Sequence, residues 1–310
     1  MIRVANAPCS WGVLEFDAPA RSVSEKREHA PSHAPAAQVL DEMAAAGYAG
    51  TELGDWGFLP TDPRTLAADV ERRALSLVGA FVPIALARED AVDEGAERAV
   101  RTGQLLAGAA GQTAVVVLSD DNTAVPNRTA RAGRIREEDG LSVEQWDRYA
   151  ERAGRVASAV RDATGIRTVF HHHCAGWVET PQEIEELMSR TDPEVLGLCL
   201  DTGHLMYAGG NPVDAIAKYR DRIWHVHFKD CKPELAKRAR AERWDYHTAV
   251  GRGIFCELGQ GMVPFASVVD ALRVEYYAGW IVVEQDVLPG RGTPAASAQR
   301  NREYLRRLGL

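Results

Sequence analysis

The sequence has no long apolar run, no basic cluster and no paired cysteines, and each absence excludes a class of protein. No segment approaches the ~20 apolar residues that a membrane-spanning helix needs. The start, MIRVANAPCSWG, lacks the basic region and long apolar stretch of a signal peptide. The five cysteines form an odd set without a CxxC pair, which argues against a disulfide framework and a zinc ribbon. We therefore expect a cytoplasmic protein without a membrane partner.

The charge balance also excludes a class of partner. The chain has 36 basic and 44 acidic residues, a formal net charge of −8, and its basic residues are scattered. A nucleic-acid partner is not indicated, and a DNA-repair endonuclease is disfavoured. With 310 residues, 45% of them hydrophobic, the chain can form one large α/β barrel or two smaller domains. No GxGxxG follows the first apolar run, which disfavours a dinucleotide-binding doubly wound sheet.

Short apolar, β-branched runs alternate with segments of helical periodicity along the whole chain. We expect strands at 2–10, 49–53, 75–82, 113–118, 166–172, 195–201, 223–229 and 280–284. Helices are expected at about 35–47, 63–73, 91–110, 143–164, 181–190, 212–220, 265–275 and 294–308. Eight such units require a parallel sheet, because each parallel crossover takes about a dozen residues. The pattern predicts a single (β/α)8 TIM-barrel domain over residues 1–310.

Three connections are longer than a barrel requires. Residues 14–34, 119–142 and 230–262 each follow a strand, so all three are expected at the C-terminal face of the barrel. The last of them contains Trp244, Tyr246 and His247. It is interpreted as a specificity element or lid, with a subunit contact as the alternative.

Polar residues of metal-ligand type end four successive strands. His171, Asp201, His227 and Glu284 each follow an apolar run, and barrel enzymes place their chemistry at these strand ends. Side chains alternate along a strand, so His225 and His227 face the same way. Two carboxylates and two imidazoles suit Mn²⁺, Co²⁺, Fe²⁺ or Zn²⁺ better than Ca²⁺. The alternative is that these residues only form hydrogen bonds at the barrel end.

Several motifs together are similar to those of a known superfamily. GYAGTELGDWGFLPTDP, FHHHCAGWVET, LCLDTGHLMYAGGNP, RIWHVHFKD, LGQG and YAGWIVVEQD occur in order between residues 5 and 305. They resemble the xylose-isomerase-like barrels of sugar isomerases and epimerases. Within that superfamily the resemblance is greatest to the inosose dehydratases of myo-inositol breakdown. DTGH and HxHxKD are shared by the whole superfamily, whereas HHHxxGxxVET, TELGxxGxLPTDP and VVEQD are narrower.

The resemblance implies a divalent metal ion and its ligands. It assigns Asp201, His227 and Glu284 to the ion, with Mn²⁺ or Co²⁺ expected first and Zn²⁺, Fe²⁺ or Mg²⁺ as further options. Ketose epimerases of this superfamily place a glutamate at the end of strand five. Here His171 holds that place, with His173 and Glu179 as alternatives.

A histidine in place of the glutamate at the end of strand five favours a dehydratase over an epimerase. Epimerisation by this superfamily uses two metal-bound carboxylates, whereas dehydration needs one base, a metal-stabilised enediolate and an acid for the leaving hydroxyl. The expected reaction is the dehydration of a cyclic polyol ketone, such as scyllo-inosose, to a trihydroxycyclohexanedione. Glu284 or Glu179 would act as base and His173 or His204 as acid, because the pKa of histidine lies near neutrality. Lys229 would neutralise the enolate, or pair with Asp230 instead.

Further residues are candidates for substrate contact. Glu52 is expected to bind substrate hydroxyls, and Trp11 and Trp56 to cover the C–H edges of the ring. Trp56 could instead cap a loop. His225 is grouped with them, although a packed or supporting histidine is the simpler interpretation.

Other functions remain open from the sequence. A ketose isomerase or epimerase is the main alternative, followed by a dehydroshikimate dehydratase and a non-catalytic sugar-binding barrel. The dehydroshikimate dehydratase would need an arginine at the cavity mouth. The arginines at 128, 131, 134 and 136 could supply one, but their clustering with acids at 137–139 favours a solvated charged face. Barrels of this kind often associate through helical faces, which leaves a homodimer or homotetramer open.

Overall fold

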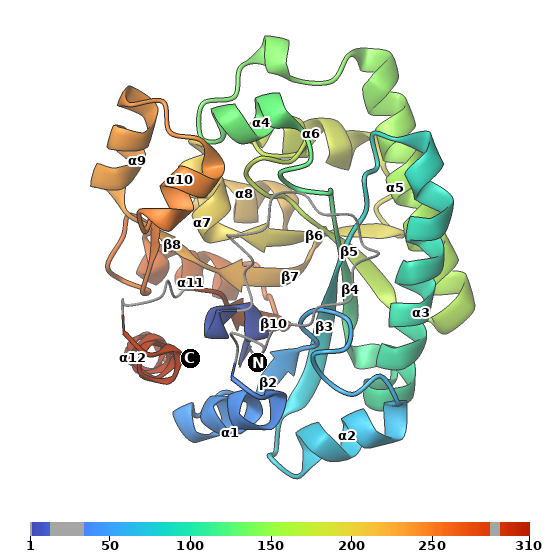
Figure 1. Cartoon of the computed structure of the whole chain (residues 1–310), viewed down its shortest axis with the longest axis vertical. Helices are drawn as coiled ribbons and strands as arrows, with labels where there is room; N and C mark the ends of the chain where they lie inside the picture. Colours follow the sequence, from blue (N-terminus) through green and yellow to red (C-terminus); the bar gives the residue numbers. More distant parts are fainter. Residues whose placement is uncertain (1, 13–33, 286–291) are drawn as a thin grey trace, which may run out of the picture.

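Eight parallel strands close into a barrel at the centre of the molecule (Figure 1). The computed structural model describes residues 2–12, 34–285 and 292–310. The barrel strands are β1 (Arg3–Asn6), β2 (Gly50–Glu52), β3 (Ser76–Pro83), β4 (Val115–Ser119), β5 (Arg167–His171), β6 (Leu196–Asp201), β7 (Ile223–Phe228) and β10 (Trp280–Val283). Around the barrel they follow the order β1-β10-β7-β6-β5-β4-β3-β2, so neighbours in sequence are neighbours in space. The predicted TIM-barrel fold is confirmed.

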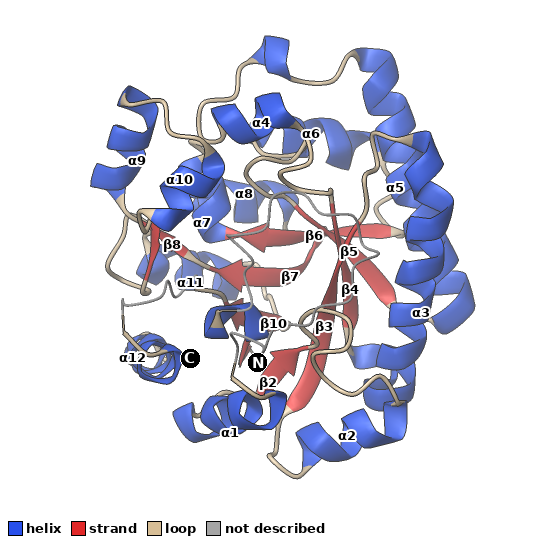
Figure 2. Ribbon diagram, viewed as in Figure 1, coloured by secondary structure: helices blue, strands red, loops and turns tan. Residues whose placement is uncertain are grey.

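Helices surround the strands, as the secondary-structure colouring in Figure 2 shows. The outer helices are α1 (Ala36–Ala46), α2 (Pro63–Glu71), α3 (Val92–Ala110), α5 (Val143–Thr164), α6 (Pro181–Arg190), α8 (Pro212–Tyr219), α11 (Phe265–Val274) and α12 (Pro294–Arg307). Four of them begin the same way, with a capping side chain followed directly by proline: Asp62, Thr180, Asn211 and Thr293. The cap satisfies a free backbone N–H group, and proline suits the first helical position because it has no N–H group to lose.

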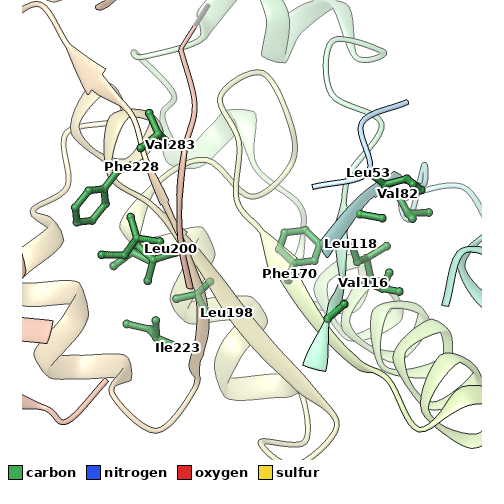
Figure 3. Close-up of a cluster of buried hydrophobic side chains, with 14 of the residues drawn as sticks. Leu53, Val82, Val116, Leu118, Phe170, Leu198, Leu200, Ile223, Phe228 and Val283 are labelled. Atoms are coloured by element: carbon green, nitrogen blue, oxygen red, sulfur yellow. The ribbon is translucent and has the colours of Figure 1, made fainter. Parts of the chain in front are cut away.

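Alternation along the strands separates two layers of side chains. Leu198 and Leu200 of β6 face the surrounding helices within the main hydrophobic core (Figure 3). Between them, Cys199 packs inside the barrel with Val117 and Val169 of the neighbouring strands. The inward residues are small and apolar in the middle of the barrel. The same alternation turns Asp201, two residues beyond Cys199, toward the barrel axis at the C-terminal end.

The first strand is shorter than expected. It ends at Asn6 and is followed by a 3₁₀ helix, η1 (Pro8–Trp11), rather than continuing to residue 10. Pro8 cannot donate a ladder hydrogen bond, and Gly12 ends the turn in the left-handed conformation (φ 84°). Most of the long connection predicted at 14–34 lies outside the described residues.

The other two long connections contain structure that periodicity did not reveal. The 119–142 connection holds α4 (Pro126–Arg131) and the 3₁₀ helix η4 (Glu137–Asp139). The 230–262 connection holds α9 (Pro233–Ala241), α10 (Tyr246–Gly251) and an antiparallel pair, β8 (Asp230–Cys231) with β9 (Phe255–Cys256). A further short helix, α7 (Thr202–Tyr207), follows β6 directly. Among the described residues, no helix is both long and apolar enough to cross a bilayer.

These two connections contact each other through arginine side chains. The contacts correct the expectation that the arginines at 128, 131, 134 and 136 all lie on a solvated charged face. Arg128 is fully buried and is not part of a solvated face. Its guanidinium group donates to both carboxylate oxygens of Glu183 (2.7 and 2.8 Å) and to the carbonyl oxygen of Gly176 (2.8 Å). Arg134 donates to the carbonyl oxygen of Trp244 (2.7 Å), so the 119–142 connection also contacts the 230–262 connection. By contrast, Arg136 pairs with Glu138 at the surface, as expected for a solvated face.

Candidate active site

Four side chains of metal-ligand type meet at the C-terminal end of the barrel. His171, Asp201, His227 and Glu284 come from β5, β6, β7 and the end of β10, and their ligand atoms all lie within 4.8 Å of one another. His227 Nδ1 lies 3.2 Å from Glu284 Oε1, and His171 Nε2 lies 3.5 Å from Asp201 Oδ2. We call these four residues the ligand cluster. Neither His173 nor Glu179 is part of it.

Local structure fixes how Asp201 enters the ligand cluster. Its Oδ1 accepts a hydrogen bond from the backbone N–H of His204 (2.7 Å) and thereby caps α7. The backbone N–H of Asp201 donates to Nε2 of His172, which faces away from the barrel axis (3.1 Å). Oδ2 therefore remains for the cluster, and it has no hydrogen-bond partner in the described part of the chain.

The donor atoms fit a divalent cation. Within the described ranges, His171 Nε2, Asp201 Oδ2 and His227 Nδ1 are all buried and form no hydrogen bond. Buried polar atoms normally have partners, and three such atoms facing one another are a donor set that a divalent cation would satisfy. Burial and the neighbouring His227 lower the pKa of His171 to about 3, which keeps its ring neutral and able to ligate. The two carboxylates offset the charge of a divalent ion.

Two overlapping groups fit a metal ion less well. Cys199 lies near His171 and His227, but burial raises the pKa of its thiol to about 12, so it stays protonated. Glu52, His225 and His227 form the other group. In that group, Glu52 Oε1 accepts hydrogen bonds from Nε2 of His225 (2.9 Å) and of His227 (3.0 Å). The nitrogens that face Glu52 therefore carry protons.

Burial and the neighbouring groups shift the pKa of His227 in opposite directions. Burial by itself would lower the pKa of His227, but Cys199, Glu284 and Glu52 raise it well above the ordinary value. The same contacts hold the pKa of the Glu52 carboxyl low despite its burial, mainly through His227 and His225. A positive charge at this position is thus favoured by the surrounding carboxylates, whether it is a proton or a cation.

A cavity of about 350 Å³ opens above the ligand cluster. This volume lies in the range of small-molecule sites. Glu52, His171 and Glu284 line it from the barrel, and Tyr246 and His247 line it from α10. Asn122 and its neighbours contribute from the start of the 119–142 connection. Two of the three long connections, 119–142 and 230–262, therefore contribute to the cavity wall, whereas 14–34 lies almost wholly outside the described residues.

Lys229 lies beside the ligand cluster as the sequence predicted. Its Nζ is 3.4 Å from Glu284 Oε2 and 4.9 Å from the centre of the Phe255 ring. Asp230 does not serve as its ion-pair partner. The Asp230 carboxylate instead accepts hydrogen bonds from four backbone N–H groups: those of Cys231, Gly259, Gly261 and Val263.

His173 and His204 lie against each other beside the cavity, with ring centres 3.9 Å apart. His173 Nδ1 donates to the carbonyl oxygen of Cys174 (2.5 Å), and the Tyr246 hydroxyl lies 3.2 Å from its Nε2. Burial and neighbouring imidazoles lower the pKa of both histidines well below the ordinary value. The neutral His173 ring therefore accepts a hydrogen bond from Tyr246. Neither ring offers the readily lost proton that a histidine acid requires.

Glu179 does not face the cavity, which argues against a role as base. It is almost fully buried, and its oxygens accept hydrogen bonds from the backbone N–H groups of Gly133 (2.6 Å) and Ala175 (2.7 Å). These contacts join the 119–142 connection to the segment after β5. Burial raises the pKa of Glu179 to about 7. The structure thus gives this carboxyl a role in holding the cavity wall.

The two predicted tryptophan contacts are also absent from the described cavity wall. Trp11 is buried in the main core, and its indole N–H donates to Glu42 of α1 (2.6 Å). Trp56 is 43% exposed, and the guanidinium group of Arg101 stacks on its ring at 4.4 Å. Neither residue lines the cavity. Tyr246 does, although its presence in the long 230–262 connection was the only sequence signal for it.

A closed parallel barrel with a ligand cluster at the C-terminal ends of its strands is the arrangement of a TIM-barrel enzyme. Sequence comparison identifies the family. Residues 40–308 match the xylose isomerase-like TIM barrel family, and the chain belongs to this family. A probable 3-DHS dehydratase from Bacillus anthracis has the same fold, with a TM-score of 0.67, 14% identity and 99% of both chains covered.

Relatives with about twice that sequence identity to this chain are inosose dehydratases. Inosose dehydratase from Lacticaseibacillus casei is 31% identical over 268 residues, which cover 86% of this chain and 88% of the relative. Inosose dehydratase from Geobacillus kaustophilus strain HTA426 is 30% identical over 307 residues, 99% of this chain and 94% of the relative.

Proposed function

We propose that this chain is a hydro-lyase of the inosose dehydratase type, which uses a divalent metal ion to remove water from a cyclic polyol ketone such as scyllo-inosose. Relatives that share about 30% of its sequence over most of both chains bear this name. Within the chain, the supporting observation is the mixed ligand cluster, with His171 at the end of β5. Mn²⁺ or Co²⁺ is the proposed ion, and cytoplasmic inositol breakdown the proposed setting.

The distribution of carboxylates favours dehydration over epimerisation. A two-base epimerisation needs a carboxylate on each face of the reacting carbon. Glu284 lines the cavity, but Glu179, the other candidate base, is turned into the protein. Asp201 uses one oxygen to cap α7 and points the other into the ligand cluster. Of the two carboxylates that the sequence offered as bases, Glu284 alone lines the described cavity, and one base is sufficient for an elimination.

Glu284 is the proposed base. Bound in the ligand cluster, the ion would polarise the ketone carbonyl and acidify the neighbouring C–H bond. Glu284 takes that proton while the C–O bond to the leaving hydroxyl breaks. The same carboxyl then returns the proton to the leaving group, so that water is released and no further acid is consumed. Lys229, 3.4 Å from this carboxylate, places positive charge where the substrate oxygen becomes negative.

The histidine pair receives a different role from the one the sequence suggested. His173 orients the hydroxyl of Tyr246 at the cavity, and His204 packs against the His173 ring. We propose that Tyr246 binds a substrate hydroxyl and that these histidines hold it in place. This assignment leaves proton transfer to Glu284.

The test uses chelator-stripped protein that is reloaded with Mn²⁺, Co²⁺, Zn²⁺ or Mg²⁺. Elimination from scyllo-inosose is followed by product absorbance, with ketohexose epimerisation as the competing reaction. Metal-dependent elimination is expected, with a loss of about 10²-fold or more in Glu284→Gln. Glu194→Gln is the matched control, because Glu194 is exposed and precedes β6 at the opposite end of the barrel. Epimerisation without elimination would overturn the proposed reaction.

A further inference from the structure

Glu52 is placed to support the ligand cluster rather than to contact substrate alone. It ends β2, only 3% of its surface is exposed, and its Oε1 accepts hydrogen bonds from two imidazoles of β7. His225 and His227 are separated by one residue, so both face the barrel axis and converge on this one oxygen. On the neighbouring strand β3, Gly79 pairs in register with Glu52 and leaves room for its side chain, because a Cβ atom at Gly79 would lie 3.3 Å from Glu52 Oε1.

The hydrogen bond to Glu52 determines which nitrogen of His227 can bind a metal ion. A carboxylate oxygen only accepts, so the Nε2 of His227 that lies 3.0 Å away must be the protonated nitrogen. A neutral ring then carries its lone pair on Nδ1. That atom lies 3.2 Å from Glu284 Oε1, inside the ligand cluster, and forms no hydrogen bond with any described residue.

His225 keeps the Glu52 carboxylate in position. It is 1% exposed, and its Nε2 donates to the same oxygen at 2.9 Å. It also lines a second cavity, of about 400 Å³, beside Arg3, Arg167 and Trp280, which begin strands at the N-terminal end of the barrel. The carboxylate is therefore held between a ligand-cluster histidine and a histidine that faces the opposite end of the barrel.

We propose that Glu52 is a positioning residue for the metal site: it holds His227 with Nδ1 directed at the ion, and His225 holds Glu52. This inference rests on the metal site proposed above. Partners of metal-ligating histidines set ring orientation and basicity, and their loss typically weakens metal binding about 10–100-fold. Substrate binding by Glu52, as the sequence suggested, would instead leave metal affinity unchanged.

The experiment measures the dissociation constant of Mn²⁺ alone, by competition with a chelator, in stripped full-length protein. Glu52→Ala is expected to weaken binding about 10–100-fold, and Glu52→Gln by roughly 10-fold, because the amide oxygen still accepts one N–H but carries no charge. Glu179→Gln is the matched control. It removes another buried carboxylate that accepts two hydrogen bonds but does not contact the ligand cluster. Its Mn²⁺ affinity is expected to equal that of the wild type.

A spectroscopic measurement separates ligand geometry from general destabilisation. The visible absorption of the Co²⁺ form is expected to change in Glu52→Gln and to stay unchanged in Glu179→Gln. Unchanged Mn²⁺ affinity in Glu52→Gln, with a raised KM for substrate, would overturn the inference and restore the substrate-binding role. Absence of Mn²⁺ binding in the wild type would overturn the metal site itself. Because Glu52→Gln preserves volume, it remains informative if Glu52→Ala does not fold.

Discussion

Replacement of Arg128 by methionine tests whether the buried ion pair holds the cavity wall together. Arg128 is fully buried, and its partner Glu183 has a side chain that is 10% exposed. The Arg128→Met variant removes two hydrogen bonds to that carboxylate and one each to the carbonyl oxygens of Gly176 and Asp139. The Glu183 carboxylate then remains buried without its cation. Breaking a buried pair in this way costs about 3–5 kcal/mol of unfolding free energy.

The assay is urea unfolding of chelator-treated protein, followed by circular dichroism. Arg88→Met is the control, because Arg88 and Asp90 form an ion pair with side chains 68% and 71% exposed. Such a surface pair contributes at most about 1 kcal/mol. An Arg128→Met variant within about 1 kcal/mol of the wild type would refute the reasoning.

A double variant separates loss of packing from loss of charge pairing. Arg128→Met combined with Glu183→Leu removes the stranded carboxylate, so it is expected to be at least about 1 kcal/mol more stable than Arg128→Met alone. It does not regain full stability, because Glu183 also accepts hydrogen bonds from the backbone N–H groups of Glu179 and Thr180. A double variant that shows the simple sum of both losses would contradict the charge argument.

Three further predictions concern Glu179, Trp56 and Tyr246. Burial raises the pKa of Glu179 from 4.5 to about 7, so its contribution to stability is present in full below pH 4.5 and is lost as the pH rises through 7. The shift corresponds to about 3 kcal/mol, so the unfolding free energy of the wild type relative to Glu179→Gln should fall by up to that amount between pH 4.5 and 8, as urea titrations at several pH values would measure. A difference independent of pH would contradict the assignment. Trp56→Ala is expected to leave kcat/KM within about twofold, because Trp56 does not line the described cavity and its stacking with Arg101 is worth about 0.5–1 kcal/mol. Tyr246→Phe should lower kcat/KM by about 10-fold through loss of the hydroxyl at the cavity, and equal losses in both variants would place Trp56 at the substrate after all.

The fold could be predicted from the sequence because its signals are local. Each strand is an apolar run bounded by turn residues. The outer helices have their own periodicity, and several have capping residues, as Ser142 and Gly165 show at the two ends of α5. The ligand cluster could be predicted for a related reason. Period-two alternation and the barrel topology together determine that His171 and Asp201, at the ends of adjacent strands, face the same axis.

The errors concern residues whose partners are distant in the sequence. Trp11 donates to Glu42, 31 positions away, and Glu179 accepts from Gly133, 46 positions away. Nothing local to either residue distinguishes a buried hydrogen-bonding role from a role at the cavity. The same applies to Tyr246, which reaches His173 only because the 230–262 connection folds back over the barrel. Residues on loops take their place from tertiary contacts, which periodicity does not encode.

The mutual attachment of the connections constrains how such a barrel can acquire a new substrate. Arg134 binds the backbone at Trp244, and Arg240 binds the backbone at Gly133 and Tyr207, so the length of each connection is matched to the others. An insertion in one of them would break contacts in two. Exchange of a side chain that only faces the cavity disturbs none of these attachments. Divergence or directed evolution of specificity should therefore proceed through point substitutions at such positions, while loop grafting from a relative would require several connections to be transferred together.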